Sequence, residues 1–401
     1  MSDDEAIRVT WNVTMLGPTR VGKTSLITAL YMAGQDFFEG KPISVSADAI
    51  TKARIHANDR EMRGELAQGR FSPGALKGST DSETNTLKIS APGSSTYELD
   101  LVFHDLPGGW MLDPASMGEY QKALADSQCV IIPIDATVLM EVDSSHVPYI
   151  LELLRVGEVA DFVREWAKTR RMQGDSTRLI LAPVKCESYF DDNGGDTDRA
   201  AELFGQVQWL YGDIAKTYRA EMGLSRHPAR SDAQTQDLAT DHAVLYAPVD
   251  TIGPIYFTGA DWGEEEDGAW VVRDDGSQMR ANFAVRTNAD GTPASRHIKG
   301  AEPILAALVT DAVAATRKEL DQRLAYERDQ KEGIEREKLY RERNPLVHLL
   351  YIITGNKRLD QKRLGALNVQ MDSLRSDLRG IRTTRESMSG EYDRTRDWPS
   401  S

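Results

Sequence analysis

Residues 17–24 decide the fold, and they read Gly17-Pro18-Thr19-Arg20-Val21-Gly22-Lys23-Thr24. Before them, apolar residues alternate from Ile7 to Met15 as in a strand, and after them a helical run is expected to close at Gly34. The spacing fits G-x-x-x-x-G-K-[ST], in which glycines let successive backbone N–H groups point at one anion and the helix start adds a favourable dipole. We therefore expect this turn to hold the phosphates of a nucleotide.

Three side chains of this turn have distinct expected roles. Lys23 places a compact positive charge on the β- and γ-phosphates, Thr24 offers a hydroxyl ligand to Mg²⁺, and Ser25 touches the α-phosphate. The residues of this segment expected to contact the nucleotide are Gly17, Thr19, Arg20, Val21, Gly22, Lys23, Thr24 and Ser25.

A second segment, Asp105-Leu106-Pro107-Gly108-Gly109, ends the strand-like stretch 97–105. Asp105 is expected to reach Mg²⁺ through water, and the Gly108 N–H to face the γ-phosphate with no side chain in the way. The metal and the γ-phosphate also call for a threonine before the preceding strand. Thr80, Thr84 and Thr86 are candidates, and Thr80 is preferred because it lies several residues ahead of that strand.

Further along the chain, apolar runs alternate with helical segments. Continuous apolar runs at 129–135 and 178–184 are typical of buried parallel strands, and helices are expected at 47–68, 115–127, 147–172 and 199–222. Another strand is expected at 242–249. The alternation predicts an α/β P-loop NTPase fold, a three-layer sandwich with a mostly parallel sheet.

Recognition of the base is expected after the strand 178–184, where the chain reads Val184-Lys185-Cys186-Glu187. The Glu187 carboxylate can accept from two adjacent N–H donors of guanine, and the backbone N–H of Ala247 can reach the base from the next strand. The lysine and the acid have the spacing of N-K-x-D, with Val for Asn and Glu for Asp. Guanine is therefore favoured, and adenine stays open.

These segments, taken in order, resemble the Ras-like, translation-factor-class superfamily of P-loop GTPases: GPTRVGKT, DLPG and VKCE, each after a strand. More narrowly, MLGPTRVGKTSL, DLPGG, PVKCE and YAPVDTIG look like bacterial double-GTPase-type domains of conflict and signalling systems. The resemblance covers about residues 8–316. It implies GTP and GDP as substrate and product, with Mg²⁺ as cofactor. The catalytic residues it suggests are Lys23, Arg20 and Thr80, and the metal ligands are Thr24, Thr80 and Asp105.

The chain departs from many such enzymes at Gly109, where a glutamine that holds the attacking water would stand. Guanylate-binding proteins carry an arginine in the P-loop that acts when two G domains pair, so Arg20 is expected to supply charge, within a nucleotide-dependent homodimer. Rival sources of that charge are Arg54, Arg60, Arg63 and Arg70. An exposed structural role for Arg20 stays open.

Charge divides the chain unevenly. Of the overall net charge of -14, residues 317–401 contribute +4, from 19 basic and 15 acidic side chains, and residues 1–316 contribute the remaining -18. We therefore expect a GTPase domain at 1–316, with a switch insert at 36–85 and a loop or hairpin insert at 254–300. A helical, coiled-coil-like arm is expected at 317–401. Helices 301–343 and 360–388 would form a C-terminal hairpin.

The arm has two alternative roles: a lever or docking arm whose position depends on the nucleotide, or a helical cap on the G domain. A contact with an acidic lipid surface is a special case of the docking role. Acidic composition disfavours nucleic acid as a partner, and two cysteines without a leader sequence favour the cytoplasm. The leading expectation is a Mg²⁺-dependent GTPase that acts as a switch or assembly protein. The alternatives are a nucleotide-binding scaffold with little turnover and an ATP-using P-loop enzyme.

Overall fold

The protein is seen here as a computed structural model. The structure describes residues 7–39, 44–71, 81–90, 97–142, 149–174, 177–193, 198–223, 244–262, 265–266, 269–270, 279–288, 290–292, 294, 297–343, 368 and 395–398.

An eight-stranded sheet forms the centre of the protein, in the order β13-β8-β7-β6-β1-β5-β4-β2. Strands β1, β5, β6, β7 and β8 are parallel, while β4, β2 and β13 are antiparallel to their neighbours. The bounds are β1 Ile7–Met15, β2 Ser44–Ala47, β4 Glu83–Ser90, β5 Tyr97–Asp105, β6 Cys129–Asp135, β7 Arg178–Val184, β8 Val244–Tyr246 and β13 Arg396–Asp397. Every residue of β7 is buried, as its continuous apolar sequence predicts.

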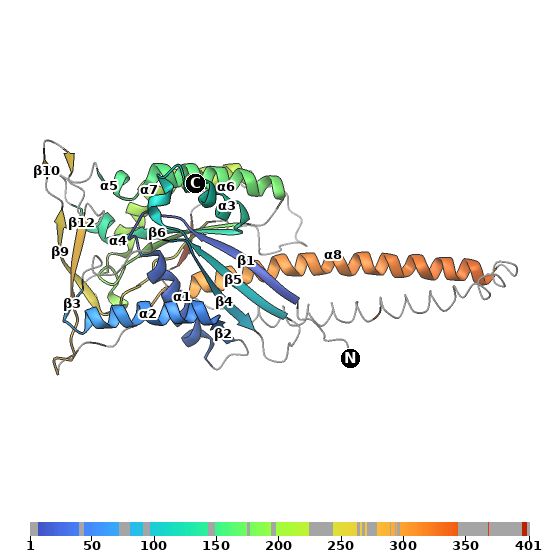
Figure 1. Cartoon of the computed structure of the whole chain (residues 1–401), viewed down its shortest axis with the longest axis horizontal. Coiled ribbons are helices and arrows are strands. Elements are labelled where there is room, and N and C mark those ends of the chain that lie inside the picture. Colours follow the sequence, from blue (N-terminus) through green and yellow to red (C-terminus); the bar gives the residue numbers. More distant parts are fainter. Residues whose placement is uncertain are drawn as a thin grey trace.

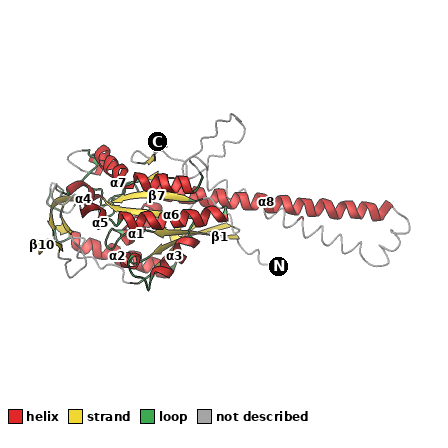
Figure 2. Ribbon diagram, turned by 90° about the horizontal axis from the view of Figure 1, so that it is seen from above, coloured by secondary structure: helices red, strands yellow, loops and turns green. Residues whose placement is uncertain are grey.

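Helices cover both faces of this sheet (Figures 1 and 2). They are α1 Lys23–Phe38, α2 Ala49–Leu66, α3 Met117–Asp126, α4 Ala136–Glu141, α5 Ile150–Leu153, α6 Val156–Gln173, α7 Ala200–Glu221 and α8 Glu302–Arg343, with short 3₁₀ turns at Gly108–Met111 and Asp191–Asn193. One core lies between the sheet and helices α1 and α8, and another between the sheet and helices α3, α4, α6 and α7. The predicted α/β three-layer sandwich with a mostly parallel sheet is confirmed.

Local expectations fail at three places. The first helix does not close at Gly34 but continues to Phe38. A Cβ at Gly34 would lie 2.8 Å from Leu305 Cδ2, so the glycine permits close packing of α1 against α8 instead of ending the helix. The helix expected at 147–172 is divided by Arg155, which has left-handed backbone (φ 52°). Within the described residues, the strand expected at 242–249 is β8, which ends at Tyr246 instead of continuing to Val249.

A second, three-stranded sheet joins two segments that are far apart in sequence. It has the order β3-β12-β9, with β3 Arg70–Phe71, β9 Ile255–Trp262 and β12 Met279–Val285, and a separate pair consists of β10 Glu265–Glu266 and β11 Ala269–Trp270. Met62 and Leu66 of α2 pack with Ile252, Ile255 and Phe283 in a core of their own. The segment before β4 and the segment after β8 therefore form one unit at the end of the molecule opposite the tip of α8 (Figure 1).

Helix α8 belongs both to the globular body and to the projecting arm (Figures 1 and 2). Its buried side chains run from Ile304 to Leu320, and Asp311 forms a two-pronged ion pair with Arg178 at the start of β7. The 23 residues beyond Leu320 extend about 35 Å at 1.5 Å per residue. The division expected at 316/317 falls within this continuous helix and stays a prediction, and the expected helix 360–388 lies almost wholly outside the described residues.

The chain returns to the sheet at its C-terminal end. Strand β13 pairs with β8, the Trp398 N–H donates to Val244 O at 3.1 Å, and the Trp398 indole packs edge-on against Phe204, with ring centroids 5.6 Å apart. In the described part of the chain, no helix combines the length and apolar character needed to cross a bilayer.

Candidate nucleotide-binding site

The turn between β1 and α1 has the conformation that its sequence predicts. Arg20 and Gly22 have left-handed backbone, with φ of 64° and 110°, and Gly22 precedes the first turn of α1, which contains no acidic side chain. The Lys23 ammonium donates to the carbonyls of Gly17 at 2.9 Å and Pro18 at 2.8 Å. A buried cation therefore sits inside a loop at a helix N-terminus, where an anion is favoured.

Burial has a marked effect on Lys23, which is only 7% exposed. It lowers the pKa of the ammonium to about 8, although nearby Asp105 acts in the opposite direction. A bound phosphate would offset the cost of burying the ammonium, because its negative charge favours the charged form of Lys23.

Asp105 adjoins this loop because β1 and β5 are neighbours and Met15 lies opposite Asp105 in their register. The Thr24 hydroxyl donates to Asp105 Oδ2 at 2.6 Å. Oδ1 of the same carboxylate is buried, with no hydrogen-bond partner among the described residues. Burial raises the pKa of Asp105, against the positive charges of Lys23 and Arg54. A buried carboxylate with one vacant oxygen, beside a threonine hydroxyl, is suited to a cation.

The donor set fits a hard cation that keeps water or substrate oxygens among its ligands. Within the described residues, no group of three or more His, Cys, Asp or Glu side chains could enclose a metal. Mg²⁺ is usually held by one or two protein groups together with phosphate and water, which agrees with the pair Thr24 and Asp105. Thr80, the third expected ligand, lies outside the described residues.

Gly108 lies directly against the phosphate loop. A Cβ at this position would come within 2.0 Å of Thr19 N and 2.2 Å of the Pro18 carbonyl carbon, whereas a Cβ at Gly109 would meet nothing within 4 Å. Only glycine allows the segment after β5 to approach the phosphate loop this closely.

Lys185 connects the loop after β7 to the phosphate loop. Its backbone is left-handed (φ 61°), and its ammonium pairs with Asp135 Oδ2 and donates to Arg20 O at 3.4 Å. The other oxygen of Asp135 accepts from Thr137 N at 3.0 Å at the start of α4. The predicted base-side lysine thus lies next to the phosphate loop, held there by an aspartate at the end of β6.

Glu187 turns inward, toward the loop that follows β8. Its Oε1 accepts from the backbone N–H groups of Ile252 at 2.5 Å and Gly253 at 3.2 Å. Its Oε2 is buried without a hydrogen-bond partner among the described residues. Burial, reinforced by Asp250, raises the pKa of Glu187 to about 7. One oxygen therefore fixes the loop after β8, and the other is a buried acceptor that no described residue satisfies.

The backbone N–H of Ala247, expected to reach the base, instead donates to Leu181 O at 3.0 Å. A base contact through this N–H would require that bond to open, and the contact stays a prediction.

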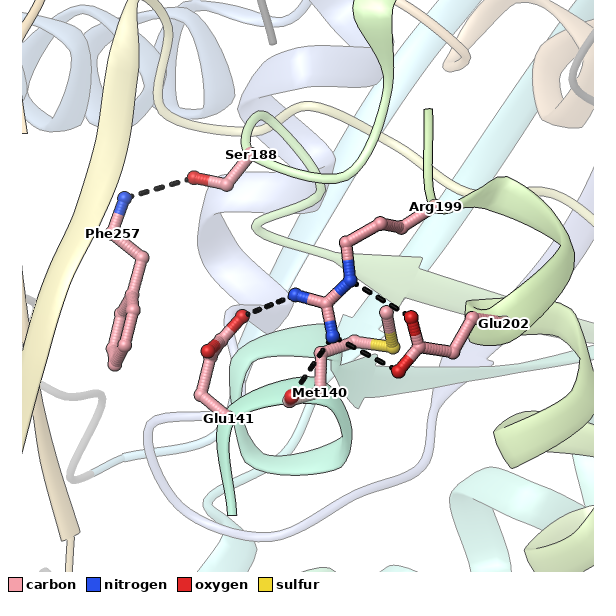
Figure 3. Close-up of polar contacts among 6 residues, drawn as sticks. All are labelled: Met140, Glu141, Ser188, Arg199, Glu202 and Phe257. Atoms are coloured by element: carbon pink, nitrogen blue, oxygen red, sulfur yellow. Dashed lines mark hydrogen bonds and ion pairs between the residues drawn. The ribbon is translucent and has the colours of Figure 1, made fainter. Parts of the chain in front are cut away.

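A group of polar contacts around Arg199 holds the loop that follows β7 (Figure 3). The Arg199 guanidinium bonds Glu141 at 2.9 Å and both oxygens of Glu202, and its ring-face contact with Tyr189 is 5.5 Å from the centroid. The Ser188 hydroxyl accepts from Phe257 N at 2.9 Å, which ties the loop to β9.

The other predicted site residues are distributed as follows. Gly17 and Val21 are buried, Arg20 and Ser25 are half-buried, and Thr19 is exposed. Of the rival arginines, Arg63 is exposed and pairs with Asp59, Arg60 is exposed, and Arg54 bonds Thr84 O at 3.1 Å.

Sequence reasoning missed Asp135 and Asn58. Asp135 could have been found as an acid at the end of an apolar run, immediately before a helix. Asn58 Nδ2 donates to Thr28 Oγ1 at 2.8 Å, and Thr28 Oγ1 donates to Thr24 O at 3.1 Å, so α2 is linked to the turn that carries Thr24. No local pattern marks that asparagine.

The phosphate loop, the Asp105–Gly108 segment and this sheet order, with antiparallel β4 beside the strand that ends at Asp105, form an α/β P-loop NTPase fold. No protein-family model matches the chain, and comparison with curated proteins finds no match.

Comparison with solved structures finds similar chains at low identity, among them the following three. A bacterial selenocysteine-specific elongation factor, EF-Sec, is 12% identical (TM-score 0.25), with 51% of this chain and 23% of that chain covered. The GTP-bound Ski7 GTPase-like domain of S. cerevisiae is 11% identical (TM-score 0.29), covering 62% and 44%. The SRb-GTP/SRX complex of Chaetomium thermophilum gives 16% identity (TM-score 0.31), covering 60% and 94%. The match thus spans less than half of the elongation factor and Ski7 chains.

Proposed function

We propose that the protein is a Mg²⁺-dependent GTPase that hydrolyses GTP to GDP and phosphate and acts as a nucleotide-dependent switch or assembly protein. The observation that carries the proposal is the cluster at the end of β1 and β5. There, the buried Lys23 ammonium, the Thr24 hydroxyl and the vacant Asp105 oxygen lie beside a loop against which Gly108 is packed.

Each group has a role that follows from its chemistry. Lys23 would exchange its carbonyl contacts for β- and γ-phosphate oxygens, and the loop N–H groups would bind the same phosphates. Thr24 and Asp105, with Thr80, would hold Mg²⁺, which neutralises charge on the β- and γ-phosphates when bound. The Gly108 N–H would be close to the γ-phosphate, so the segment after β5 would respond to its loss.

Guanine is the base we propose, because Glu187 Oε2 has no partner among the described residues and a carboxylate oxygen can accept from an N–H donor of guanine. Lys185 would lie along the base while its ammonium stays on Arg20 O. Competition between GTP and ATP for the protein tests this assignment, and a preference for ATP would overturn it.

Hydrolysis itself is tested by incubating the full chain with GTP, with Mg²⁺ or with excess chelator, and with Lys23→Ala. We expect turnover that requires the metal, and a loss of nucleotide affinity of at least tenfold in Lys23→Ala because the buried charge is removed. A matched control is Lys52→Ala, which removes an exposed lysine of α2. Unchanged affinity in Lys23→Ala would contradict the proposal.

A nucleotide-binding scaffold is the second candidate, and Gly109 is the observation that favours it, because this position has no side chain to hold the attacking water. Single-turnover measurement with protein in excess over GTP separates the two.

We propose Arg20 as a source of charge on the γ-phosphate, in a homodimer formed with nucleotide. We also propose a protein partner for the arm. Both cysteines are buried and neither forms a disulfide, which fits the proposed location in the cytoplasm.

A further inference from the structure

Helix α2 brings an arginine to the proposed metal site from a segment that lies outside the phosphate loop. Its first turn is fixed by Asp48, whose carboxylate accepts from Thr51 N at 2.8 Å, and the Thr51 hydroxyl accepts from Thr86 N of β4 at 2.9 Å. Its middle is fixed by the bond from Asn58 to Thr28 of α1. The helix is therefore tied both to β4 and to α1, the helix that begins at the phosphate loop.

Arg54 is positioned by this helix at the beginning of β4. Its Nη1 donates to Thr84 O at 3.1 Å, and its Nε lies 3.7 Å from Glu83 Oε1. In the β4–β5 register, Glu83 lies opposite Asp105. The guanidinium is close enough that its positive charge lowers the pKa of the Asp105 carboxyl, against the effect of burial. Arg54 is thus a partly exposed cation with further N–H donors, beside the carboxylate of the proposed Mg²⁺ site.

Two other arginines of this insert, Arg60 and Arg63, do not share that placement. Arg63 pairs with Asp59 on the outer side of α2, and Arg60 is exposed. Arg20 lies on the phosphate loop, where its carbonyl is taken by Lys185.

We propose that Arg54 binds the γ-phosphate of GTP and stabilises the charge that develops there during hydrolysis, so that α2 supplies an arginine in addition to the one proposed at Arg20. The inference rests on the proposed function. In the reaction, a water oxygen bonds to the γ-phosphorus while the bond to the β–γ bridging oxygen breaks. The leaving GDP keeps the electron pair, and the water proton passes to phosphate or solvent. A guanidinium with paired donors suits the spread of negative charge over the γ-oxygens.

The test compares Arg54→Ala and Arg54→Lys with wild type in single-turnover hydrolysis, with Mg²⁺ and protein in excess. Arg54→Ala is expected to slow hydrolysis about 10²- to 10³-fold, the scale of losing one charge-stabilising donor. GDP affinity and melting temperature are expected to stay as in wild type. Added guanidinium ion should restore part of the rate to Arg54→Ala, which a purely structural role would not allow. Lys52→Ala and Arg60→Ala, on the same helix, are the controls.

A second readout does not depend on turnover. If Arg54 binds the γ-phosphate, its replacement by alanine should lower the preference for GTP over GDP several-fold. The inference is overturned if Arg54→Ala slows hydrolysis no more than Lys52→Ala does, or leaves the preference for GTP over GDP unchanged. If the wild-type chain binds nucleotide without hydrolysing it, the proposed enzyme activity fails, and the affinity ratio still decides the role of Arg54. If the wild-type chain binds neither nucleotide, both proposals fail.

Discussion

At the scale of single residues, the site contains two buried ionisable groups with displaced pKa values in the same pH region. Burial lowers the pKa of Lys23 to about 8 and raises the pKa of Glu187 to about 7. Both groups are expected to bind nucleotide in their charged forms. Glu187 is charged above about pH 7 and Lys23 is charged below about pH 8, so both are mostly charged between these two values. Nucleotide affinity should therefore depend on pH.

We expect GTP affinity to be highest between about pH 7 and pH 8. Below about pH 7, Glu187 is protonated and must release its proton to accept from guanine, so affinity falls as pH decreases, by up to about tenfold per unit. Above about pH 8, Lys23 is neutral and must take up a proton, so affinity falls as pH increases. Equilibrium titration from pH 5.5 to 9.5 measures both limbs. Glu187→Gln should flatten the acid limb and keep the alkaline one, and a flat profile in wild type would contradict the expectation.

At the scale of elements, the segment after β5 lies directly against the backbone of the phosphate loop at Gly108. The space at Gly108 is closed by Thr19 and Pro18, whereas Gly109 one residue later faces open space. The two glycines therefore form a matched pair for testing whether this contact matters.

Gly108→Ala is expected to push the segment away from the phosphate loop and to slow GTP hydrolysis at least tenfold. GDP affinity should change little, because the phosphate-loop contacts to a diphosphate do not involve this segment. Gly109→Ala has room for its methyl group and should retain wild-type rates. Single-turnover hydrolysis and GDP titration of both variants provide the measurement. Equal rates for the two variants would show that the close approach at Gly108 is unimportant.

At the scale of the whole molecule, the residues just before α8 and the C-terminal strand β13 both contact β8 or the segment that follows it. The Asp250 N–H donates to Lys299 O at 3.0 Å just before α8, and a Cβ at Gly300 would lie 2.1 Å from Pro248 O. At the other end, β13 pairs with β8 itself. Glu187 accepts from Ile252 N and Gly253 N in the loop after β8. The start of α8, β13 and the proposed base site are therefore all connected to β8 and the loop that follows it.

Trp398→Ala is expected to release β13 from the sheet, because the indole is buried beside Phe204 and carries the anchoring contact. Loss of a buried aromatic side chain costs about 3 kcal/mol, although local detachment of a terminal strand can limit the effect on global unfolding. Hydrogen exchange of the β8 amides should accelerate, and urea unfolding gives the global free energy. The control is Trp209→Ala, since Trp209 of α7 is 62% exposed. Unchanged exchange in Trp398→Ala would contradict this account.

The sequence by itself determined the phosphate loop, the strand that precedes it, the apolar strands β6 and β7, and hence the α/β class. These features depend on short-range spacing: glycine conformations, a lysine at a helix start, and apolar runs long enough for a buried strand. Lys23, Thr24, Asp105 and Gly108 come together as expected because the carboxyl ends of adjacent parallel strands meet at one edge of the sheet.

Only the tertiary structure decided which distant segments became partners. The inward turn of Glu187, the approach of Arg54 to Asp105, the packing of Gly34 under Leu305 and the pairing of β13 with β8 all join residues far apart along the chain. Local periodicity reports which face of an element is buried but not what covers it. That choice depends on shape and on the satisfaction of buried polar groups once the whole core has formed.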